Sequence, residues 1–291
     1  MIKKYKIIKN TKNIIIFILS VFLIFLIKEC ILNSKTKSNP KIMKVHFINV
    51  GQGDSILIQV NNKNLIIDSG PKDNKNNLLK YLNKLNINSF DYVIATHPHE
   101  DHIGNMAYLI NNYKVYNFYA PKSMQDTSSF ETMIEALVRK NLKINILKAN
   151  TNTIDLGEDT TVEVFSPTLE TYENLNNYSP IIKITYKNNS FLFTGDAETL
   201  IENEVLNKNY NLKSDVLKVA HHGSSTSSST NFIKKVNPSI SVISVGKYNS
   251  YNHPNINTLE TLKNTTIYRT DLNNNIVIES DGLNLKTSFK W

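Results

Sequence analysis

THPHEDH, residues 96–102, holds three of the seven histidines of this 291-residue chain. His97 and His99 alternate along an extended segment, so their imidazoles lie on the same side of the backbone. Asp101 and His102 follow at once and add a carboxylate and a third imidazole. The spacing predicts half of a two-metal site, in which one ion takes His97 and His99 and a second takes Asp101 and His102, as in binuclear hydrolases. The competing interpretation is a surface loop with ordinary hydrogen-bonding histidines.

Two further polar groups follow predicted strands. Gly195-Asp196 ends the apolar run FLFTGD, where glycine permits close backbone approach and a carboxylate could bridge two ions. His221-His222 follows the run DVLKVA in the same manner. At least one of these two histidines is expected to bind metal, while the other orients a neighbour or touches substrate. Loops after strands can project such side chains into a shared cleft.

Three other residues are assigned supporting roles. Asp68 ends the run LIID and is expected to hold the ligand loop by hydrogen bonds outside the metal. His253, in Asn-His-Pro after another strand, is expected to contact a phosphoryl oxygen or to protonate a leaving group, or to be an ordinary loop histidine. Ser224 precedes a predicted helix, and this loop either caps the helix and offers N–H groups to a phosphate or is a flexible serine loop.

The composition limits which side chains could bind a metal and which partners the domain could have. The single cysteine, Cys30, excludes an intramolecular disulfide and a cysteine-based zinc cage, so any metal must be held by histidine and carboxylate. Residues 1–44 contain ten lysines and one acid, a net charge of +9 against +8 for the whole chain. Residues 45–291 therefore sum to about −1, and the bulk charge does not indicate a basic groove that tracks nucleic acid.

The N-terminal segment is typical of a signal or membrane anchor. Five lysines precede the apolar run 14–27, which is the size of a signal-peptide core and shorter than the 17–25 residues of a spanning helix. No cleavage motif follows, so residues 1–32 are predicted to form a hydrophobic helix, either an uncleaved anchor or a signal, and 33–42 a linker. Basic residues before the span place the domain 43–291 outside the cytoplasm, held at the cell membrane or secreted.

The rest of the chain alternates short apolar runs with turns. Two β-rich halves, each with helices, predict an α+β fold of two packed sheets with helices outside. Strands are expected at 43–50, 55–60, 65–68, 91–96, 114–120, 143–148, 162–167, 181–186, 190–196, 215–220, 239–246, 265–270, 275–280 and 283–289. Helices are expected at 77–85, 103–112, 128–140, 198–206 and 231–236.

Taken together, these motifs resemble the metallo-β-lactamase superfamily, and more narrowly the soluble hydrolase domain of ComEC-type DNA-uptake proteins. The resemblance is carried by NVGQGDSILI (49–58), LIIDSG (65–70), THPHEDHIGN (96–105), FLFTGDAE (191–198), KVAHHGS (218–224), ISVG (243–246) and NHP (252–254). It implies an αββα sandwich of two mixed β-sheets with two divalent ions at one edge. As implied ligands it gives His97, His99, Asp101, His102, Asp196 and one of His221 and His222, with Gly223 favouring His222.

The chain departs from the family pattern in two ways. The superfamily has a further histidine before Gly-Asp, whereas no histidine occurs here between 103 and 220; the region reads NLNNYSP (174–180). The first metal is then short of a ligand, and Asn177 or Ser179 could supply oxygen, which makes manganese as suitable as zinc. The chain also has one hydrophobic run where a DNA channel has many, so a stand-alone relative is expected.

The expected activity is metal-dependent hydrolysis. A metal-bridging hydroxide would attack the phosphorus of a phosphodiester, with Asp101 and Asp196 holding the ions and His253 assisting. Phosphoester substrates, DNA among them, are the expected partners, together with the membrane. Two alternatives remain at this point: an extracellular small-molecule hydrolase, such as a phosphorylcholine-type esterase or a lactonase, and a non-catalytic DNA-binding remnant.

Overall fold

The structure, a computed structural model, describes residues 20, 22–24, 28 and 41–290. The chain divides into two units, residues 1–41 and 42–291. Most of the predicted N-terminal helix and of the linker lies outside the described residues, so the predicted membrane anchor stays a prediction. In the part of the chain that is described, no helix has the length and apolar character needed to cross a membrane.

The first sheet has eight strands and combines both pairing directions. Its pairs are antiparallel from β14 to β3 and parallel from β3 to β6. The order across the sheet is β14 (Leu285–Lys290), β13 (Asn275–Ser280), β1 (Met43–Phe47), β2 (Ile56–Val60), β3 (Lys63–Ile67), β4 (Ser89–Ile94), β5 (Lys114–Ala120) and β6 (Ile144–Ile146).

The second sheet has six strands and is also mixed. Strands β9 to β12 run parallel, and β7, β8 and β9 form an antiparallel meander. The order is β12 (Thr266–Arg269), β11 (Ile240–Ile243), β10 (Val216–Lys218), β9 (Asn189–Phe193), β8 (Ile182–Tyr186) and β7 (Thr160–Val164).

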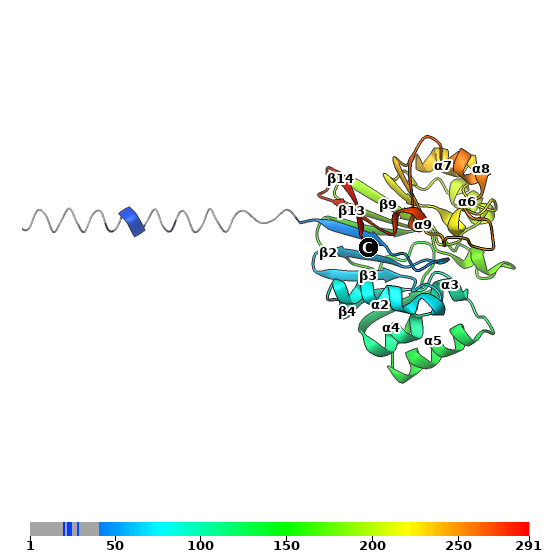
Figure 1. Ribbon diagram of the computed structural model, residues 1–291, viewed down its shortest axis with the longest axis horizontal. Helices are drawn as coiled ribbons and strands as arrows, with labels where there is room; N and C mark the ends of the chain where they lie inside the picture. The colour runs from blue at the N-terminus through cyan, green and yellow to red at the C-terminus, as the bar shows by residue number, and fades with distance from the viewer. Residues whose placement is uncertain (1–19, 21, 25–27, 29–40, 291) are drawn as a thin grey trace, which may run out of the picture. The chain divides into compact units, whose positions relative to one another are not determined.

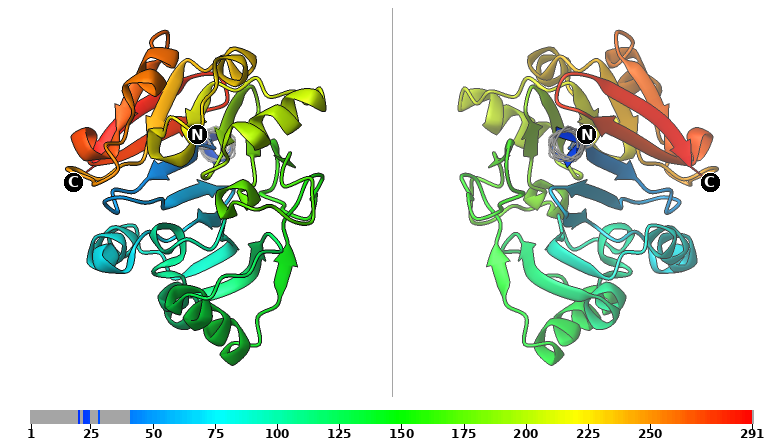
Figure 2. Two further views of the ribbon diagram at one scale, coloured as in Figure 1. Left: turned by 90° about the vertical axis from the view of Figure 1, so that its right-hand side faces the viewer. Right: turned by 90° about the vertical axis from the view of Figure 1, so that its left-hand side faces the viewer.

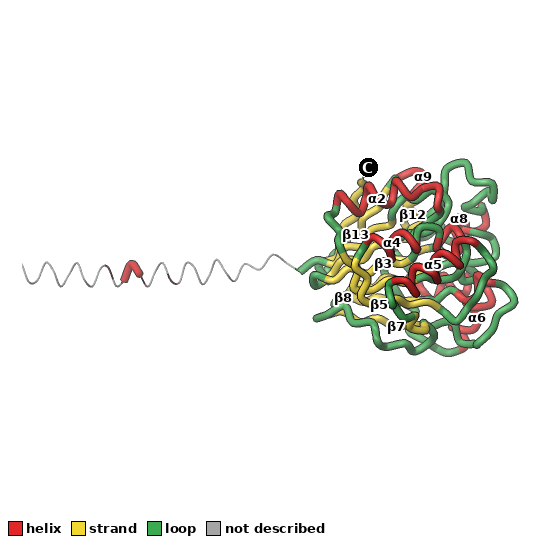
Figure 3. The backbone as a smooth tube through the Cα atoms, turned by 90° about the horizontal axis from the view of Figure 1, so that it is seen from below, coloured by secondary structure: helices red, strands yellow, loops and turns green. Residues whose placement is uncertain are grey.

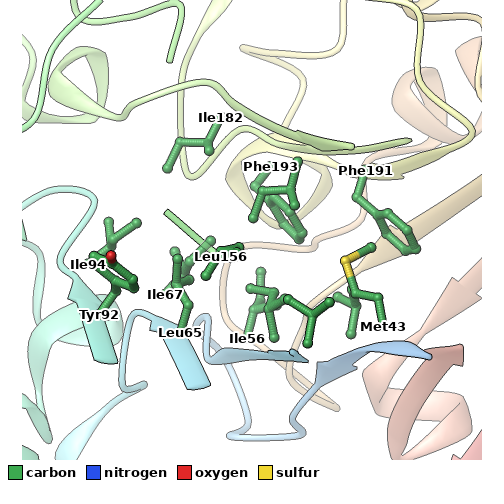
Figure 4. Packing of buried hydrophobic residues seen from close by; sticks show 14 of the residues in the cluster. Met43, Ile56, Leu65, Ile67, Tyr92, Ile94, Leu156, Ile182, Phe191 and Phe193 are labelled. Atoms are coloured by element: carbon green, nitrogen blue, oxygen red, sulfur yellow. The ribbon is translucent and has the colours of Figure 1, made fainter. Parts of the chain in front are cut away.

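The core lies between the two sheets because alternate residues of each strand point to the same face. On β2, Ile56 and Ile58 enter the layer between the sheets, while Leu57 between them faces the helices. From the second sheet, Phe191 and Phe193 of β9 enter the same layer. Figure 4 shows the side chains of Ile56, Phe191 and Phe193 pointing into the layer between the two sheets. Face-to-face burial of two apolar sheet surfaces therefore holds the domain together.

Helices cover the outer face of each sheet (Figures 1 and 3). The first sheet packs against α2, α4 and α5, and the second against α6, α7 and α8. This arrangement is the predicted αββα sandwich. The helices are α2 (Lys75–Lys84), α3 (Glu100–Ile103), α4 (Met106–Asn112), α5 (Ser128–Arg139), α6 (Thr199–Asn207), α7 (Thr230–Val236), α8 (Ile256–Thr261) and α9 (Thr270–Asn273), with 3₁₀ turns η1 (Lys72–Asn74), η2 (Leu175–Tyr178) and η3 (Ala220–Gly223).

Three expectations from the sequence are wrong in detail. The sheets are not the two halves of the chain, because the C-terminal hairpin β13–β14 pairs with β1 of the first sheet (Figure 2). The predicted helix 103–112 is shorter, because only residues 106–112 form α4; Ile103 is the last residue of the separate helix α3, and Gly104 and Asn105 lie between the two. The predicted strand 265–270 ends at Arg269, where the short helix α9 begins.

The loops that contain the candidate site residues all lie at the same edge of the sandwich. Strands β3 and β4 are parallel, as are β9, β10 and β11, so within each sheet their carboxyl ends lie together. Asp68 follows β3, the histidine segment follows β4, Asp196 follows β9 and the His221-His222 pair follows β10. The parallel parts of the two sheets therefore position the candidate site.

Candidate metal centre

Four side chains converge where β4, β9 and β10 end. Asp101, His102, Asp196 and His222 each offer one ligand atom within 4.8 Å of the other three. Oδ2 of Asp196 lies 3.3 Å from Nε2 of His102 and 3.5 Å from Nε2 of His222. Nε2 of His222 also lies 3.2 Å from Oδ2 of Asp101. Residues from three separate motifs thus face one point.

His102 is fixed from the side opposite this point by Asp68. Its Nδ1 lies 2.8 Å from Oδ2 of Asp68, and both side chains are fully buried. Asp68 is itself held by Thr96, which donates its backbone N–H and its hydroxyl to the two carboxylate oxygens. A carboxylate on Nδ1 orients the ring and leaves Nε2 for a metal, the usual arrangement around metal-bound histidine.

The two adjacent histidines have different environments. His222 is buried, and its Nδ1 lies 2.9 Å from the carbonyl oxygen of Ser244, which leaves Nε2 facing the two aspartates. His221 is partly exposed, with its Nε2 3.8 Å from Oδ2 of Asp196. Its Nδ1 lies 3.1 Å from the hydroxyl of Thr226. This geometry favours His222 as the metal ligand, whereas His221 lies at the surface beside the cluster.

His97 and His99 form a second group next to the first. Nε2 of His97 lies 2.9 Å from Nδ1 of His99 and 3.9 Å from Oδ2 of Asp196. The buried hydroxyl of Ser179 lies 3.3 Å from Nδ1 of His97 and accepts the backbone N–H of Asp196. Ser179 therefore contacts the ring nitrogen that faces away from His99, an arrangement that suits orientation of His97 more than metal binding.

Asn177 also makes a contact outside the cluster. Its Oδ1 accepts the backbone N–H of Glu198, and the side chain of Asn176 donates to the Glu198 carboxylate. Glu198 in turn accepts the hydroxyl of Thr226 and lies 3.5 Å from Nδ1 of His221. Glu198 thus joins residues 174–180, the segment that lacks the family histidine, to the His221 loop, a role that no local sequence pattern indicates.

The backbone at two of these loops requires unusual conformations. Gly195 has φ +49°, and a Cβ there would lie 3.0 Å from Oγ of Ser179. His221 and His222 have φ values of 49° and 53°, in the left-handed region that non-glycine residues rarely occupy. Consecutive left-handed residues cost free energy and persist where the surrounding structure demands them, which is typical of functional sites. They turn both imidazoles toward Asp196.

The donor atoms fit a divalent cation. Among the described residues, Nε2 of His102, Nε2 of His222 and Oδ1 of Asp196 are buried and have no hydrogen-bond partner. An unpaired buried polar atom costs about 1–3 kcal/mol, which coordination of a cation would offset. Imidazole nitrogens and carboxylate oxygens without thiolate suit zinc and manganese alike.

The electrostatics agree with this assignment. Burial opposes the ionised form of Asp196, but the nearby His102 and His222 outweigh it and hold the pKa of this carboxyl well below its usual range. Burial likewise lowers the pKa of His102, yet the carboxylates of Asp196 and Asp101 raise it well above the ordinary value. The carboxylates of the cluster therefore favour positive charge at its centre.

Two charged residues behind the cluster were missed as site residues. Asp54, between the predicted strands 43–50 and 55–60, is buried, and its Oδ1 lies 3.6 Å from Nδ1 of His222. Its Oδ2 pairs at 2.5 Å with Nζ of Lys218, which is also buried. The signal was present in the sequence, because a lysine inside the apolar run DVLKVA must find a counter-charge if the strand is buried.

The cluster opens into a cleft of about 480 Å³. Asp101, Asp196, His221, His222 and His253 line it, together with Gln52, Pro71, His99, Glu100, Asn176 and Tyr251. Ser224 does not line the cleft; it is buried, and its hydroxyl lies 3.1 Å from that of Thr226. The predicted residues therefore separate into those that face the cleft and those that support them.

An αββα sandwich with a histidine and aspartate cluster at one edge defines the class of protein. The chain belongs to the Metallo-beta-lactamase superfamily, whose family model matches residues 48–247. It is 31% identical over 253 residues to ComE operon protein 3 of Bacillus subtilis (strain 168), covering 80% of this chain and 32% of that protein. It is 28% identical over 251 residues to Recombination protein 2 of Haemophilus influenzae, covering 83% of this chain and 29% of that protein.

The chain thus spans about a third of the length of these curated relatives. Among solved structures, the metallo-beta-lactamase fold protein YhfI from Bacillus subtilis matches with a TM-score of 0.55 and 14% identity, over 82% of this chain and 100% of YhfI. At that identity the likeness shows the fold alone. The resemblance indicated by the sequence motifs is confirmed.

Proposed function

We propose that this chain is a metal-dependent phosphodiesterase that cleaves nucleic acid strands. The observation that carries the proposal is the cluster of Asp101, His102, Asp196 and His222 beside an open cleft. Three of these residues have buried polar atoms with no hydrogen-bond partner in the part of the chain that the structure describes, as expected of a cation site. The resemblance of the motifs to ComEC-type DNA-uptake proteins supports nucleic acid as the substrate.

Asp101, His102, Asp196 and His222 would hold one divalent cation, and His97 and His99 a second, weaker one. When bound, such cations polarise a phosphoryl oxygen and lower the pKa of water toward 7. Asp68 and the carbonyl of Ser244 keep the two buried imidazoles in the required orientation.

For His253 we propose substrate binding rather than proton supply. It lines the cleft, and its Nδ1 is buried with no hydrogen-bond partner among the residues described. Burial and the neighbouring His221 and His222 lower its pKa to about 4, so its imidazole is neutral at pH 7. A neutral imidazole donates one hydrogen bond and accepts another. We therefore assign His253 a hydrogen bond to a phosphoryl oxygen.

A small-molecule hydrolase is the second candidate. The net charge of residues 45–291 is about −1, whereas proteins that track a nucleic acid backbone present basic surface to it. This observation favours a compact substrate such as a phosphorylcholine ester or a lactone. The non-catalytic remnant is disfavoured, because a decayed site is not expected to keep Asp101, His102, Asp196 and His222 together.

The test uses the purified full-length chain, freed of metal by chelation and reloaded with zinc or manganese. It is given single-stranded DNA, bis-p-nitrophenyl phosphate and p-nitrophenylphosphorylcholine, and elemental analysis of the protein as purified identifies the resident metal. Asp196→Asn is expected to lower phosphodiester cleavage by more than about 100-fold, because it removes a ligand. Asp155→Asn is the matched control, since Asp155 is exposed and pairs with Lys63.

If the metal-loaded chain cleaves none of these phosphodiesters, the proposed function is wrong. Full activity of Asp196→Asn would contradict the assignment of the site. Cleavage of the phosphorylcholine ester without cleavage of DNA would establish the second candidate instead.

We further propose that the N-terminal segment holds the domain at the outer side of the cell membrane. The support is the run of five lysines followed by the apolar residues 14–27. Protease added to intact cells that express the full chain with a C-terminal tag should remove the tag. Protection of the tag, with digestion only after lysis, would show that the domain is inside the cell.

A further inference from the structure

One loop at the rim of the cleft exposes aromatic rings. It follows β11 and comprises residues 247–253, KYNSYNH, which we call the tyrosine loop. Tyr248 is 92% exposed and Tyr251 is 66% exposed. Tyr251 lines the cleft, and one face of its ring stacks on His253 at 5.7 Å between centroids with an interplanar angle of 20°. Tyr251 thus borders the cleft of the candidate metal centre, and Tyr248 lies three positions before it in the same loop.

Exposed rings of this kind need an explanation. Aromatic side chains gain free energy when their faces leave water, so rings that remain in water beside a cleft indicate a ligand surface. Among the described residues, the exposed tyrosines are Tyr116, Tyr248 and Tyr251, and two of these lie in the tyrosine loop. One loop therefore holds two of these three exposed tyrosines, and one of the two lines the cleft.

The tyrosine loop is also held in place by one side chain. Asn249 donates from Nδ2 to the carbonyl oxygens of Gly246 and His253, at 3.0 and 2.7 Å. Its Oδ1 accepts the backbone N–H groups of Tyr251 and His253, at 3.2 and 2.9 Å. A single amide thus closes the loop on itself, and a preorganised surface loses less conformational entropy when a ligand binds.

The charge next to the rings distinguishes between possible ligands. Nζ of Lys247 lies 5.1 Å from the centroid of the Tyr248 ring, within the range of a cation–π contact. A ring already beside an ammonium is a poor site for a second cation such as choline. It suits a ligand that combines a flat ring with a negative charge, which describes a nucleotide.

Resting on the proposed function, we propose that Tyr248 and Tyr251 stack unpaired nucleobases and so select nucleic acid strands whose bases are free. Lys247 meets the backbone phosphate between the stacked bases. Stacking on aromatic side chains tolerates any base, because every base has a π face, and it does not require a basic groove. This accounts for nucleic acid recognition by a domain of near-neutral charge.

The test compares two single-stranded oligodeoxynucleotides of equal length, one with bases and one with abasic residues near the cleavage site. For Tyr251→Ala and Tyr248→Ala, the ratio of kcat/KM on the base-bearing strand to kcat/KM on the abasic strand should fall about tenfold for each ring, mainly through KM. Tyr→Phe at either position should restore the ratio, since stacking needs the ring and not the hydroxyl.

Tyr116→Ala is the matched control. Tyr116 is 52% exposed and lies 4.6 Å from the ammonium of Lys114, but it is in the first half of β5, away from the carboxyl end where the site lies. This variant should leave the ratio unchanged. Thermal unfolding of all variants shows whether any change comes from lost stability.

Binding is measured separately from cleavage, by fluorescence anisotropy of both labelled strands on Asp196→Asn chains with and without the tyrosine substitutions. An equal loss on the base-bearing and abasic strands would overturn the proposal, as would a loss confined to p-nitrophenylphosphorylcholine. If the chain binds the base-bearing strand through these rings and yet cleaves no phosphodiester, the proposed function is wrong, and the assignment of the tyrosine loop to base stacking is supported.

Discussion

The ammonium of Lys218 and the carboxylate of Asp54 form a buried ion pair behind the candidate metal centre, with Nζ 2.5 Å from Oδ2. Both side chains are at most 1% exposed. Lys218 also donates to the carbonyl oxygen of Gly195, the residue before Asp196, at 3.3 Å. The pair therefore connects the turn after β1 with the end of β9 and with strand β10, two of the three strands whose ends carry the cluster.

Replacing Lys218 by Met should destabilise the domain strongly. It leaves the Asp54 carboxylate buried without a counter-charge, which costs about 3–5 kcal/mol in the free energy of unfolding. Urea unfolding measures this loss. The double variant with Asp54→Asn should lose less than the sum of the two single changes, because the unpaired charge is then gone. Strictly additive losses would show that the pair is not coupled.

Asp68→Asn should weaken metal binding while keeping the fold. The amide has the shape of the carboxylate but lacks the charge that orients His102 through Nδ1. Metal affinity should fall about 10–100-fold, as for other partners of metal-bound histidines. Competition with a chromogenic chelator gives the affinity, and Asp155→Asn on the exposed surface provides the comparison. Unchanged affinity would assign Asp68 a purely structural role.

Gly53→Ala should impair the site because the space for a side chain is absent. Gly53 has φ +145°, and a Cβ would lie 2.2 Å from the backbone carbonyl oxygen of Asp101. The loop that carries Asp101 must move, so hydrolytic activity should fall by at least tenfold. Gly282→Ala is the comparison. Gly282 also has a positive φ, of +92°, but a Cβ there would meet the flexible side chain of Lys187. That variant should lose stability and keep its activity per folded molecule.

Stability should depend on pH through His46. Burial, together with the nearby Lys44, lowers the pKa of this histidine to about 4, and its Nδ1 lies 2.9 Å from the Tyr81 hydroxyl. In the unfolded chain the pKa is near 6.5. Between pH 6.5 and 4 the unfolded chain binds a proton that the folded chain does not, so the free energy of unfolding falls as the pH is lowered.

His46 contributes about 3 kcal/mol to the pH dependence over this window, because each unit of difference between the folded and unfolded pKa corresponds to about 1.4 kcal/mol. His46→Gln should flatten the curve between pH 6.5 and 4 and leave the region above pH 6.5 parallel to that of the unaltered chain. Urea unfolding across pH 4–8 measures both curves. The same slope in both proteins would assign the pH dependence to other groups.

Removing the metal should lower both activity and stability. The carboxylates of Asp101 and Asp196 then face each other without a cation, and the buried imidazole nitrogens lose their partner. A cation at 100 times its dissociation constant stabilises the folded state by about 2.7 kcal/mol. Thermal unfolding with and without EDTA, followed by readdition of zinc or manganese, shows the shift. An unchanged Tm after verified metal removal would contradict the assignment.

Much of the fold follows from local patterns. Period-two alternation on segments such as 55–60 indicates strands with one face in each of two layers, and β2 does place Ile56 and Ile58 in one layer and Leu57 in the other. The αββα class follows from the mixture of such strands with amphipathic helices. The partner of the final hairpin does not follow, because alternation gives the face of a strand but not its neighbour.

The polar residues of the site were partly predictable for a similar reason. His102 and Asp68 stand out because histidines and carboxylates cluster after predicted strands. Glu198, Asp54 and Lys218 were missed, since their role depends on partners far away in the chain: Lys218 lies 164 positions beyond Asp54, the residue that it neutralises.

The amino-acid sequence by itself determined the kinds of ligand atom available, the spacing of the HPHEDH segment and the class of fold. These are local properties, set by residue type and by the period of a strand. Only the tertiary structure decided that His222 rather than His221 faces Asp101, that Ser179 supports His97, and that the tyrosine loop borders the cleft. The reason is physical: ring orientation depends on which nitrogen finds a partner, and those partners come from strands that meet only when the sheets pack.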